Sequence, residues 1–351
     1  MSHQFLLYGA TGFVGAAIAE LAVKMGLSPI LAGRDPNKLS SLAEELALEY
    51  RPFSLDDPVA VDAALEGMGA VLNCAGPFIY TFGPMVDACI RRGIHYADIT
   101  GELPVFAAIA ERDKEAKERG VMLLPGAGFD VLPTDCLAVH LKQRLPSATT
   151  LTLAFMGRGP SGLPPGTQRT AIELVPYGNR IRKDGRLEAP KRGIKTRQVD
   201  FGYGPVETTR VTWGDVFTAF YSTGIGNIEV YAGFPKSVQR QIAMFEYIGP
   251  LLKWRPVREF MKRGVRPGPT AGKRALAKTL VWGEVKNEEG ESVVARLKGP
   301  EAGVEWTALA ALSVVRRVLG GDAPPGYQTP GKAYGADFVL ESEGVVREEV
   351  S

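Results

Sequence analysis

The chain has 351 residues, of which 45% are hydrophobic and 23% are charged, and its formal net charge is +2. The length suffices for two domains with full cores, and the composition is typical of a globular protein. The small net charge excludes a general attraction to nucleic acid, and no apolar run approaches the ~20 residues of a membrane-spanning helix.

The cysteines and histidines argue against a metal site and against disulfides. Three cysteines, Cys74, Cys89 and Cys136, are far apart and form no C-x-x-C pair, so we expect neither a disulfide framework nor a zinc knuckle. The three histidines are too few and too scattered for a metal site unless carboxylates join them. We therefore expect a reducing, cytoplasmic compartment. Because the chain enters a strand by Phe5, we also expect no signal peptide.

The first predicted elements form a strand, a glycine turn and a helix. Residues 5–8 are apolar, and an Ala- and Val-rich helical pattern follows the turn. Gly9 allows a sharp reversal, Gly12 leaves the backbone open to a pyrophosphate, and Gly15 lets the helix pack closely on its strand. The N–H groups of residues 12–14 then face an anion. The spacing departs from the common G-x-G-x-x-G, so the prediction of a dinucleotide site depends on this strand–turn–helix context.

The end of the second predicted strand, residues 29–32, selects the cofactor. An NAD site carries a carboxylate here, whereas this chain has Gly33, without a side chain, and then Arg34, whose guanidinium suits a phosphate. Lys38 adds a second positive charge. Asp35 is better explained as the N-cap of the next helix, because a proline follows it. The pattern favours NADP(H) over NAD.

Strands and helices continue to alternate as far as residue 125. We predict strands at 50–55, 71–77, 95–99 and 121–125, and helices at 36–50, 57–65, 85–92 and 104–119. This order is that of an α/β domain with a doubly wound parallel sheet, a Rossmann domain over residues 1–130. The fourth strand runs into a Gly-Pro turn at Ala75, Gly76 and Pro77, at the edge where such sheets bind ligands.

The pattern changes after a glycine-rich hinge at residues 126–130 and a helix at 133–145. Long alternating runs predict strands at 149–155, 208–212, 227–231, 280–286 and 291–297, with a hairpin turn at 287–290 and helices near 167–176, 237–252 and 303–319. Residues 131–320 should therefore form an α+β domain on a largely antiparallel sheet, covered by those helices, for substrate binding or dimerisation. We expect the segment at about 320–351 to return to the first domain.

Polar residues after the fifth strand and in the hinge are the candidates for chemistry. Strand alternation places Tyr96 and Asp98 on one side, so Tyr96 could donate to an oxyanion while Asp98 or Glu102 binds substrate or tunes the tyrosine. Asp130 lies in the hinge. The alternative is that Asp98, Thr100 and Glu102 only cap the next helix and order the loop. No tyrosine is followed four residues later by lysine, which excludes the short-chain dehydrogenase mechanism.

Two basic stretches, residues 180–197 and 253–266, stand out against the near-neutral whole. The second interleaves lysines and arginines with Trp254, Phe260 and Met261. Such a helix suits an anionic membrane surface or an acidic carrier protein, and the alternative is a solvated face. Neither stretch belongs to a recognisable nucleic-acid-binding module, so we expect no nucleic-acid partner.

Several motifs together resemble the saccharopine dehydrogenase-like oxidoreductases, including bacterial members called trans-acting enoyl reductases. The motifs are LYGATGFVG at 7–15, LAGRD at 31–35, NCAGPF at 73–78, GIHYADITGE at 93–102, GAGFDVLPTD at 126–135, WGEV at 282–285, LKGPEAGVEWTA at 297–308 and GYQTPGKAYGAD at 326–337. The resemblance implies that the residues in contact with NADP(H) are Gly9, Thr11, Gly12, Phe13, Val14, Arg34, Ala75, Gly76 and Pro77.

The resemblance implies an NADPH-dependent oxidoreductase. We expect it to reduce a C=C bond conjugated to a carbonyl, or a C=O or C=N bond, on a hydrophobic or acyl-carrier-borne substrate. One rival is a saccharopine-type reductase that couples an aldehyde with an amine. Another is a non-catalytic NADP(H)-binding scaffold at a membrane surface. The sequence leaves open whether the chain forms a homodimer.

Overall fold

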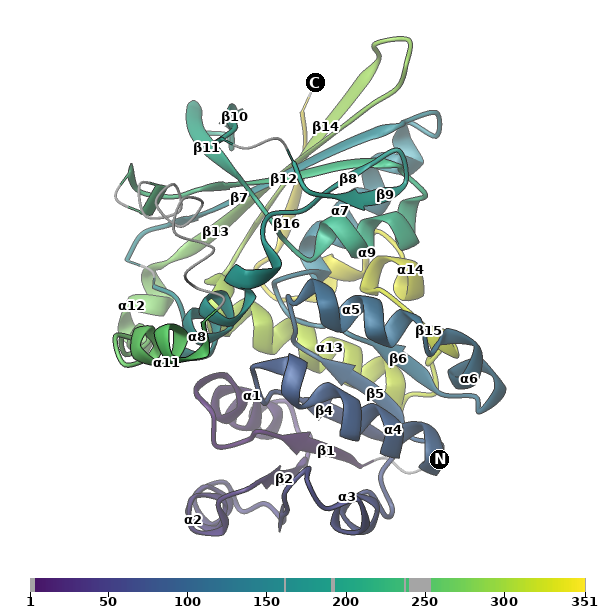
Figure 1. The fold of residues 1–351 in the computed structure, drawn as a ribbon, viewed down its shortest axis with the longest axis vertical. Helices are drawn as coiled ribbons and strands as arrows, with labels where there is room; N and C mark the ends of the chain where they lie inside the picture. The colour runs from purple at the N-terminus through teal and green to yellow at the C-terminus, as the bar shows by residue number, and fades with distance from the viewer. Residues whose placement is uncertain (1–3, 161, 191–192, 237, 240–253, 351) are drawn as a thin grey trace. The chain divides into compact units, whose positions relative to one another are not determined.

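The computed structural model describes residues 4–160, 162–190, 193–236, 238–239 and 254–350 (Figure 1). The chain divides into two compact units, Met1–Leu132 with Gly303–Ala333, and Pro133–Ala302 with Tyr334–Ser351. Most of the helix expected near 237–252 lies outside the described residues, as do Lys191, Arg192 and Lys253 of the basic stretches.

The first unit is built on a seven-stranded sheet with the order β15-β6-β5-β4-β1-β2-β3. Its strands are β1 (Phe5–Tyr8), β2 (Ile30–Gly33), β3 (Tyr50–Pro52), β4 (Ala70–Asn73), β5 (His95–Asp98), β6 (Met122–Leu124) and β15 (Gly326–Tyr327). Every neighbouring pair is parallel. The order of the first six strands is that of a Rossmann sheet, which confirms the predicted α/β class. The order reverses between β1 and β4, which is where such sheets bind ligands.

Helices pack on this sheet in two groups. They are α1 (Phe13–Lys24), α2 (Pro36–Leu46), α3 (Pro58–Ala64), α4 (Phe82–Arg92), α5 (Leu103–Ala110), α6 (Asp113–Glu118) and α13 (Thr307–Leu319), with the single turn η1 (Phe78–Tyr80). α1 lies beside α13, and α3 lies beside α4. Because the crossovers are right-handed on either side of the reversal, the two groups cover opposite faces. The short elements η3 (Ala302–Trp306) and α14 (Pro330–Tyr334) lie where the chain passes between the units.

Two predicted helices differ from the structure. The helix predicted at 104–119 is two helices, because the Arg112 N–H bonds the carbonyl of Ile109 in a tight turn and its guanidinium binds Asp87 and Glu115. The helix near 303–319 was assigned to the second sheet, and this was wrong. Its main part, α13, packs on β4 and β5 of the first sheet. It buries small apolar residues such as Ala308 and Ala311, and such a face would fit either sheet.

The second unit is built on a mixed sheet in which β12 and β7 are parallel and all other neighbours are antiparallel. Its strands are β7 (Thr150–Arg158), β8 (Ile181–Lys183), β9 (Arg186–Glu188), β10 (Thr196–Asp200), β11 (Pro205–Val211), β12 (Asn227–Gly233), β13 (Lys278–Lys286), β14 (Ser292–Gly299) and β16 (Val346–Val350). The largely antiparallel sheet is thus confirmed. We expected residues 320–351 to return to the first domain. Only part of this segment does so, because β15 joins the first sheet whereas β16 pairs with β14 of the second sheet.

Helices and short turns complete the second unit. The helices are α7 (Leu132–Arg144), α8 (Pro165–Leu174), α9 (Asp215–Thr223), α11 (Arg255–Lys262) and α12 (Ala271–Leu276), with the turns η2 (Val175–Tyr177) and η4 (Phe338–Glu341). α7 covers one face of the sheet, where Leu137 and Leu141 fill the space above Gly283. On the other face Phe201 packs with Tyr231 and Trp282. In the described residues no helix is both long and apolar enough to cross a membrane.

Candidate cofactor-binding and active site

The turn between β1 and α1 has no room for side chains at two of its glycines. Gly9 has a φ of +81°, and a Cβ there would lie 2.8 Å from the backbone nitrogen of Ala75. A Cβ on Gly15 would overlap the carbonyl oxygen of Gly9 and lie 3.0 Å from its carbonyl carbon. Gly12 is the exposed N-cap of α1. The predicted roles of Gly9 in the reversal and of Gly15 in close packing are confirmed.

The N-terminus of α1 has the character of an anion site. Thr11, Gly12, Phe13 and Val14 are all at least partly exposed, and the first turn of α1 carries no acidic residue. The first N–H groups of a helix have no partner within the helix, and they lie at the positive end of its dipole. This end of α1 therefore suits a pyrophosphate. That these four residues contact NADP(H) stays a prediction.

The end of β2 presents a guanidinium without a competing carboxylate. Gly33 is buried and Arg34 is exposed. In the described part of the chain, no hydrogen bond or ion pair engages the Arg34 guanidinium. The carboxylate of Asp35 accepts the N–H groups of Asn37 and Lys38, both at 3.2 Å, which confirms its role as the N-cap of α2. It also lies 3.5 Å from the Lys38 ammonium, so Arg34 is freer than Lys38 to bind a phosphate.

Asn73 shapes the loop after β4. Its side-chain oxygen accepts the N–H of Ala75 at 3.0 Å, and its amide donates to Thr81 at 3.2 Å and to Tyr96 at 3.3 Å. Thr81 in turn donates to the carbonyl of Ala75 at 2.7 Å. Asn73 and Thr81 are missing from the sequence-based candidates. An asparagine that ends a buried strand just before a Gly-Pro turn was the available signal for Asn73.

Glu102 binds the same loop from the other side. Its two carboxylate oxygens accept the N–H groups of Phe78 at 2.8 Å and of Ile79 at 2.9 Å, and the residue is fully buried. A charged acceptor for two backbone donors is among the stronger protein hydrogen bonds. Glu102 and Asn73 together fix residues 75–81, which include the predicted cofactor contacts Ala75, Gly76 and Pro77.

Tyr96 and Asp98 form a buried pair on one side of β5, as strand alternation predicts. The Tyr96 hydroxyl donates to Asp98 at 2.8 Å, and the other Asp98 oxygen accepts the N–H groups of Thr100 and Gly126. Burial raises the pKa of Asp98 to about 7, and that of Tyr96 well above its ordinary value. These contacts give Asp98 the loop-ordering role that we weighed as its alternative, and Tyr96 supports Asp98 by donating to it. A catalytic role for Tyr96, Asp98 or Glu102 stays a prediction.

Asp130 is in a different situation from the other three candidates. It is partly exposed, and among the described residues no hydrogen bond or ion pair engages its carboxyl group. Burial, and secondarily the charge of Glu102, raises its pKa to about 7. A Cβ on Gly101 would lie 2.8 Å from an Asp130 oxygen, so the glycine makes room for this carboxyl. Asp130 can therefore hold a proton near neutral pH and give it up.

Other ionisable residues that are near these candidates in the sequence make structural contacts or are buried. His95 accepts the N–H of Met122 at 3.0 Å, and burial lowers its pKa. Asp135 accepts a hydrogen bond from Ser222 at 2.6 Å in the first turn of α7. Burial raises the pKa of the Cys74 and Cys136 thiols, so both stay protonated. Within the described residues, no cluster of histidine, cysteine and acidic side chains could hold a metal ion.

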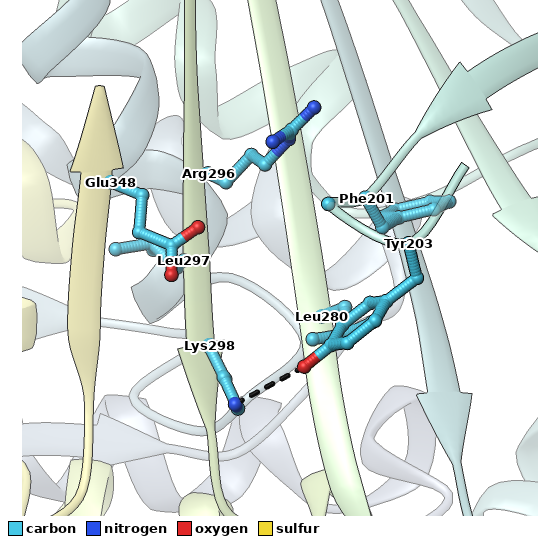
Figure 2. A pocket seen from close by; sticks show the side chains of 8 residues that line it. Phe201, Tyr203, Leu280, Arg296, Leu297, Lys298 and Glu348 are labelled. Carbon is cyan, nitrogen blue, oxygen red and sulfur yellow. Dashed lines mark hydrogen bonds between the residues drawn. The ribbon is translucent and has the colours of Figure 1, made fainter. Parts of the chain in front are cut away.

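The second unit carries a small pocket that contains none of these candidates. It measures about 120 Å³ and is lined by residues that include Phe201, Tyr203, Arg296, Lys298 and Glu348. Figure 2 shows the Lys298 ammonium reaching the Tyr203 hydroxyl, a hydrogen bond of 3.2 Å. Ligand pockets usually measure some 300 Å³ or more, so this one is too small for a dinucleotide.

Comparisons with known proteins support a nucleotide-binding role for the first unit. Residues 5–124 match the family described as the saccharopine dehydrogenase NADP binding domain, which confirms NADP(H) as the predicted cofactor. The human saccharopine dehydrogenase-like oxidoreductase is 28% identical over 194 residues, 48% of this chain and 45% of that protein. The chain thus spans about half the length of the curated relatives it matches.

Two further relatives are mycobacterial. A trans-acting enoyl reductase of Mycobacterium ulcerans is 32% identical over 163 residues, 43% of this chain and 38% of that protein. A putative trans-acting enoyl reductase of Mycobacterium tuberculosis is 30% identical over 215 residues, 55% of this chain and 50% of that protein. These relatives confirm the resemblance that the motifs indicate.

The fold has a counterpart among solved structures. Apo saccharopine dehydrogenase (L-Glu forming) of Saccharomyces cerevisiae aligns with a TM-score of 0.66, covering 99% of this chain and 100% of that chain. The two sequences are 15% identical. The likeness therefore shows a shared fold.

Proposed function

We propose that this chain is an NADPH-dependent oxidoreductase, because residues 5–124 match the family described as the saccharopine dehydrogenase NADP binding domain. The observation that carries the proposal is the phosphate-binding character at the β1–β4 reversal. A glycine turn leads into the N-terminus of α1, and the end of β2 presents Arg34, which is paired with no carboxylate of the described residues. NADPH, when bound, supplies a hydride for reduction.

Each part of the site has an assigned task. The N-terminus of α1 holds the pyrophosphate, and Arg34 holds the adenosine 2′-phosphate. Asn73 and Glu102 keep residues 75–81 in one conformation, since they bind the backbone of Ala75, Phe78 and Ile79.

We assign Asp130 to deliver the proton that completes the reduction. Its pKa of about 7 keeps much of it protonated at neutral pH, and its carboxyl has no described partner to compete with a substrate atom. Asp98 holds the adjoining backbone by accepting the N–H groups of Thr100 and Gly126, and Tyr96 donates to Asp98. They are positioning residues in this account.

The substrate we propose has a C=C bond conjugated to a carbonyl, or a C=O or C=N bond, and is hydrophobic or carrier-borne. The support for the enoyl form is the identity of 30% to 32% with two proteins named trans-acting enoyl reductases. A saccharopine-type coupling of an aldehyde with an amino acid is the second candidate, favoured by the fold shared with the yeast enzyme.

Consumption of NADPH by the purified protein tests the proposal. The substrates are a 2-enoyl thioester on acyl carrier protein, an apolar ketone, and an aldehyde mixed with an amino acid. Consumption with either of the first two supports the proposal, and consumption only with the third favours the saccharopine-type reaction. NADPH binding without consumption in any mixture would indicate the non-catalytic scaffold.

Asp130→Asn separates chemistry from binding. We expect its rate to fall by about 100-fold or more, as for loss of a general acid, with NADPH affinity unchanged. The matched control is Asp184→Asn, an exposed aspartate in the hairpin between β8 and β9 of the second unit. Equal rates for Asp130→Asn and the wild type would remove Asp130 from the reaction.

A further inference from the structure

The helix α11 is oriented with charged side chains toward the protein. The Arg258 guanidinium binds the carboxylate of Glu173 in α8 at 3.1 Å, and the Lys262 ammonium binds the same carboxylate. Glu173 is buried, and the Arg258 and Lys262 side chains are mostly buried against it. Val257 and Met261 are also partly buried. The buried side of α11 is therefore fixed by an ion-pair cluster together with apolar contacts.

Away from the contact with Glu173, α11 and its N-cap residue expose two large aromatic side chains. Phe260 is two positions from Arg258, about 200° around the helix, and 71% of its surface is exposed. Trp254, the N-cap residue of α11, is 73% exposed. Both exposures are high for residues of this size, because such side chains normally bury most of their area. Two large apolar side chains are thus exposed at the surface of α11.

Three exposed arginines belong to the same segment as the exposed aromatics. Arg255, Arg263 and Arg266 are exposed, and no described carboxylate pairs with any of their side chains. The one acidic residue of the helix, Glu259, is bound by Lys262 at 2.7 Å. The exposed residues Trp254, Arg255, Phe260, Arg263 and Arg266 therefore combine apolar aromatic groups with an excess of positive charge. We call these residues the outer surface of α11.

We propose that this outer surface of α11 docks on an anionic lipid bilayer. Trp254 and Phe260 enter the boundary between headgroups and acyl chains, where aromatic side chains are favoured. Arg255, Arg263 and Arg266 bind lipid phosphates and carboxylates, while their apolar stems stay at the interface. A purely solvated face accounts for the arginines but leaves both aromatics in water. The bilayer accounts for both, and it places the protein beside hydrophobic molecules.

Vesicle flotation tests the proposal on the full chain. Vesicles of phosphatidylcholine alone are compared with vesicles that also contain phosphatidylserine, at low and high salt. We expect the wild type to float with the phosphatidylserine vesicles at low salt and to be released by high salt. The double variant Trp254→Ser/Phe260→Ser and the variant Arg255→Glu/Arg263→Glu should each bind at least tenfold more weakly.

Two controls match these variants in exposure and charge. Val59→Ser removes another highly exposed apolar side chain, and Lys114→Glu reverses another exposed charge, both in the first unit. Both controls should bind vesicles like the wild type, and thermal unfolding should show that every variant is folded. Trp254 gives a direct signal, because its fluorescence should shift to shorter wavelength on binding. Trp254→Phe should lose that shift.

Three outcomes would overturn the proposal. The first is a wild type that ignores phosphatidylserine vesicles. The second is equal binding by the wild type and the folded double variant. The third is an association with an acidic carrier protein, lost in the Arg255→Glu/Arg263→Glu variant, in the absence of any vesicle binding. None of them bears on whether the protein oxidises NADPH.

Discussion

A Cβ atom on Gly15 would overlap the carbonyl oxygen of Gly9, and this relationship fixes how closely α1 lies on β1. The Gly15→Ala variant must therefore move α1 away from the turn that faces the predicted pyrophosphate. We expect a loss of about 1–3 kcal/mol in the free energy of unfolding, as for overpacked cores, together with weaker NADPH binding. Thermal unfolding and calorimetry measure the two effects.

Gly83→Ala is the matched control for that change. Gly83 lies in α4, and a Cβ there would meet no atom within 4 Å. Alanine favours a helix over glycine by roughly 0.5–1 kcal/mol, so we expect an unchanged or slightly higher melting temperature. A Gly15→Ala protein as stable as Gly83→Ala and equal to it in NADPH affinity would show that the turn tolerates a side chain.

Glu102→Gln should loosen residues 77–81. A glutamine side chain offers one oxygen where Phe78 and Ile79 both donate, and its NH₂ group faces one of those donors. Leaving one buried N–H unsatisfied costs about 1–3 kcal/mol. Amide hydrogen exchange at Phe78 and Ile79 should accelerate. The control Glu111→Gln, at an exposed position, should change neither the hydrogen exchange nor the stability. Unchanged exchange at Phe78 and Ile79 in Glu102→Gln would show that the Glu102 carboxylate does not hold these residues in place.

The Asp130 carboxyl should make the protein less stable as pH rises toward neutrality. Its pKa is about 7 in the folded protein against an ordinary 3.8, so between these values the folded state binds more protons than the unfolded state. The free energy of unfolding then falls from about pH 4 to about pH 7 and levels off above the folded pKa.

Asp130→Asn removes this contribution to the pH dependence. We expect the variant and the wild type to be similarly stable near pH 4, and the variant to be the more stable of the two at pH 8. Melting temperatures at several pH values measure the difference. Asp98, whose pKa is also about 7, titrates in both proteins and cancels in the comparison. A constant difference across pH would mean that Asp130 ionises normally.

Local signals in the sequence were sufficient to predict the first six strands of the first sheet but not its seventh strand, β15. Glycines, proline after Asp35 and runs of apolar residues mark strand ends and helix starts, because those features depend on neighbours in the chain. The placement of α13 could not be predicted this way. Its buried face of small residues fits either sheet, and it reaches β4 and β5 from more than 200 residues away in sequence.

The candidate site shows the same limit. Strand alternation placed Tyr96 and Asp98 together, but it could not show that the hydroxyl of Tyr96 is held between Asn73 and Asp98. Nothing local to Glu102 indicates that its carboxylate binds Phe78 and Ile79, because the contact spans more than twenty residues. Asp130 was predicted from its place in the hinge, and its raised pKa depends on its burial and on Glu102.

The most direct test of the account is calorimetric titration of the wild type, Arg34→Ala and Lys38→Ala with NADPH and with NADH. The account predicts that the wild type prefers NADPH and that Arg34→Ala loses most of that preference while its NADH affinity changes little. Lys38→Ala should lose less, because Asp35 already engages the Lys38 ammonium. Tighter binding of NADH by the wild type, or equal loss of both dinucleotides in Arg34→Ala, would contradict the account.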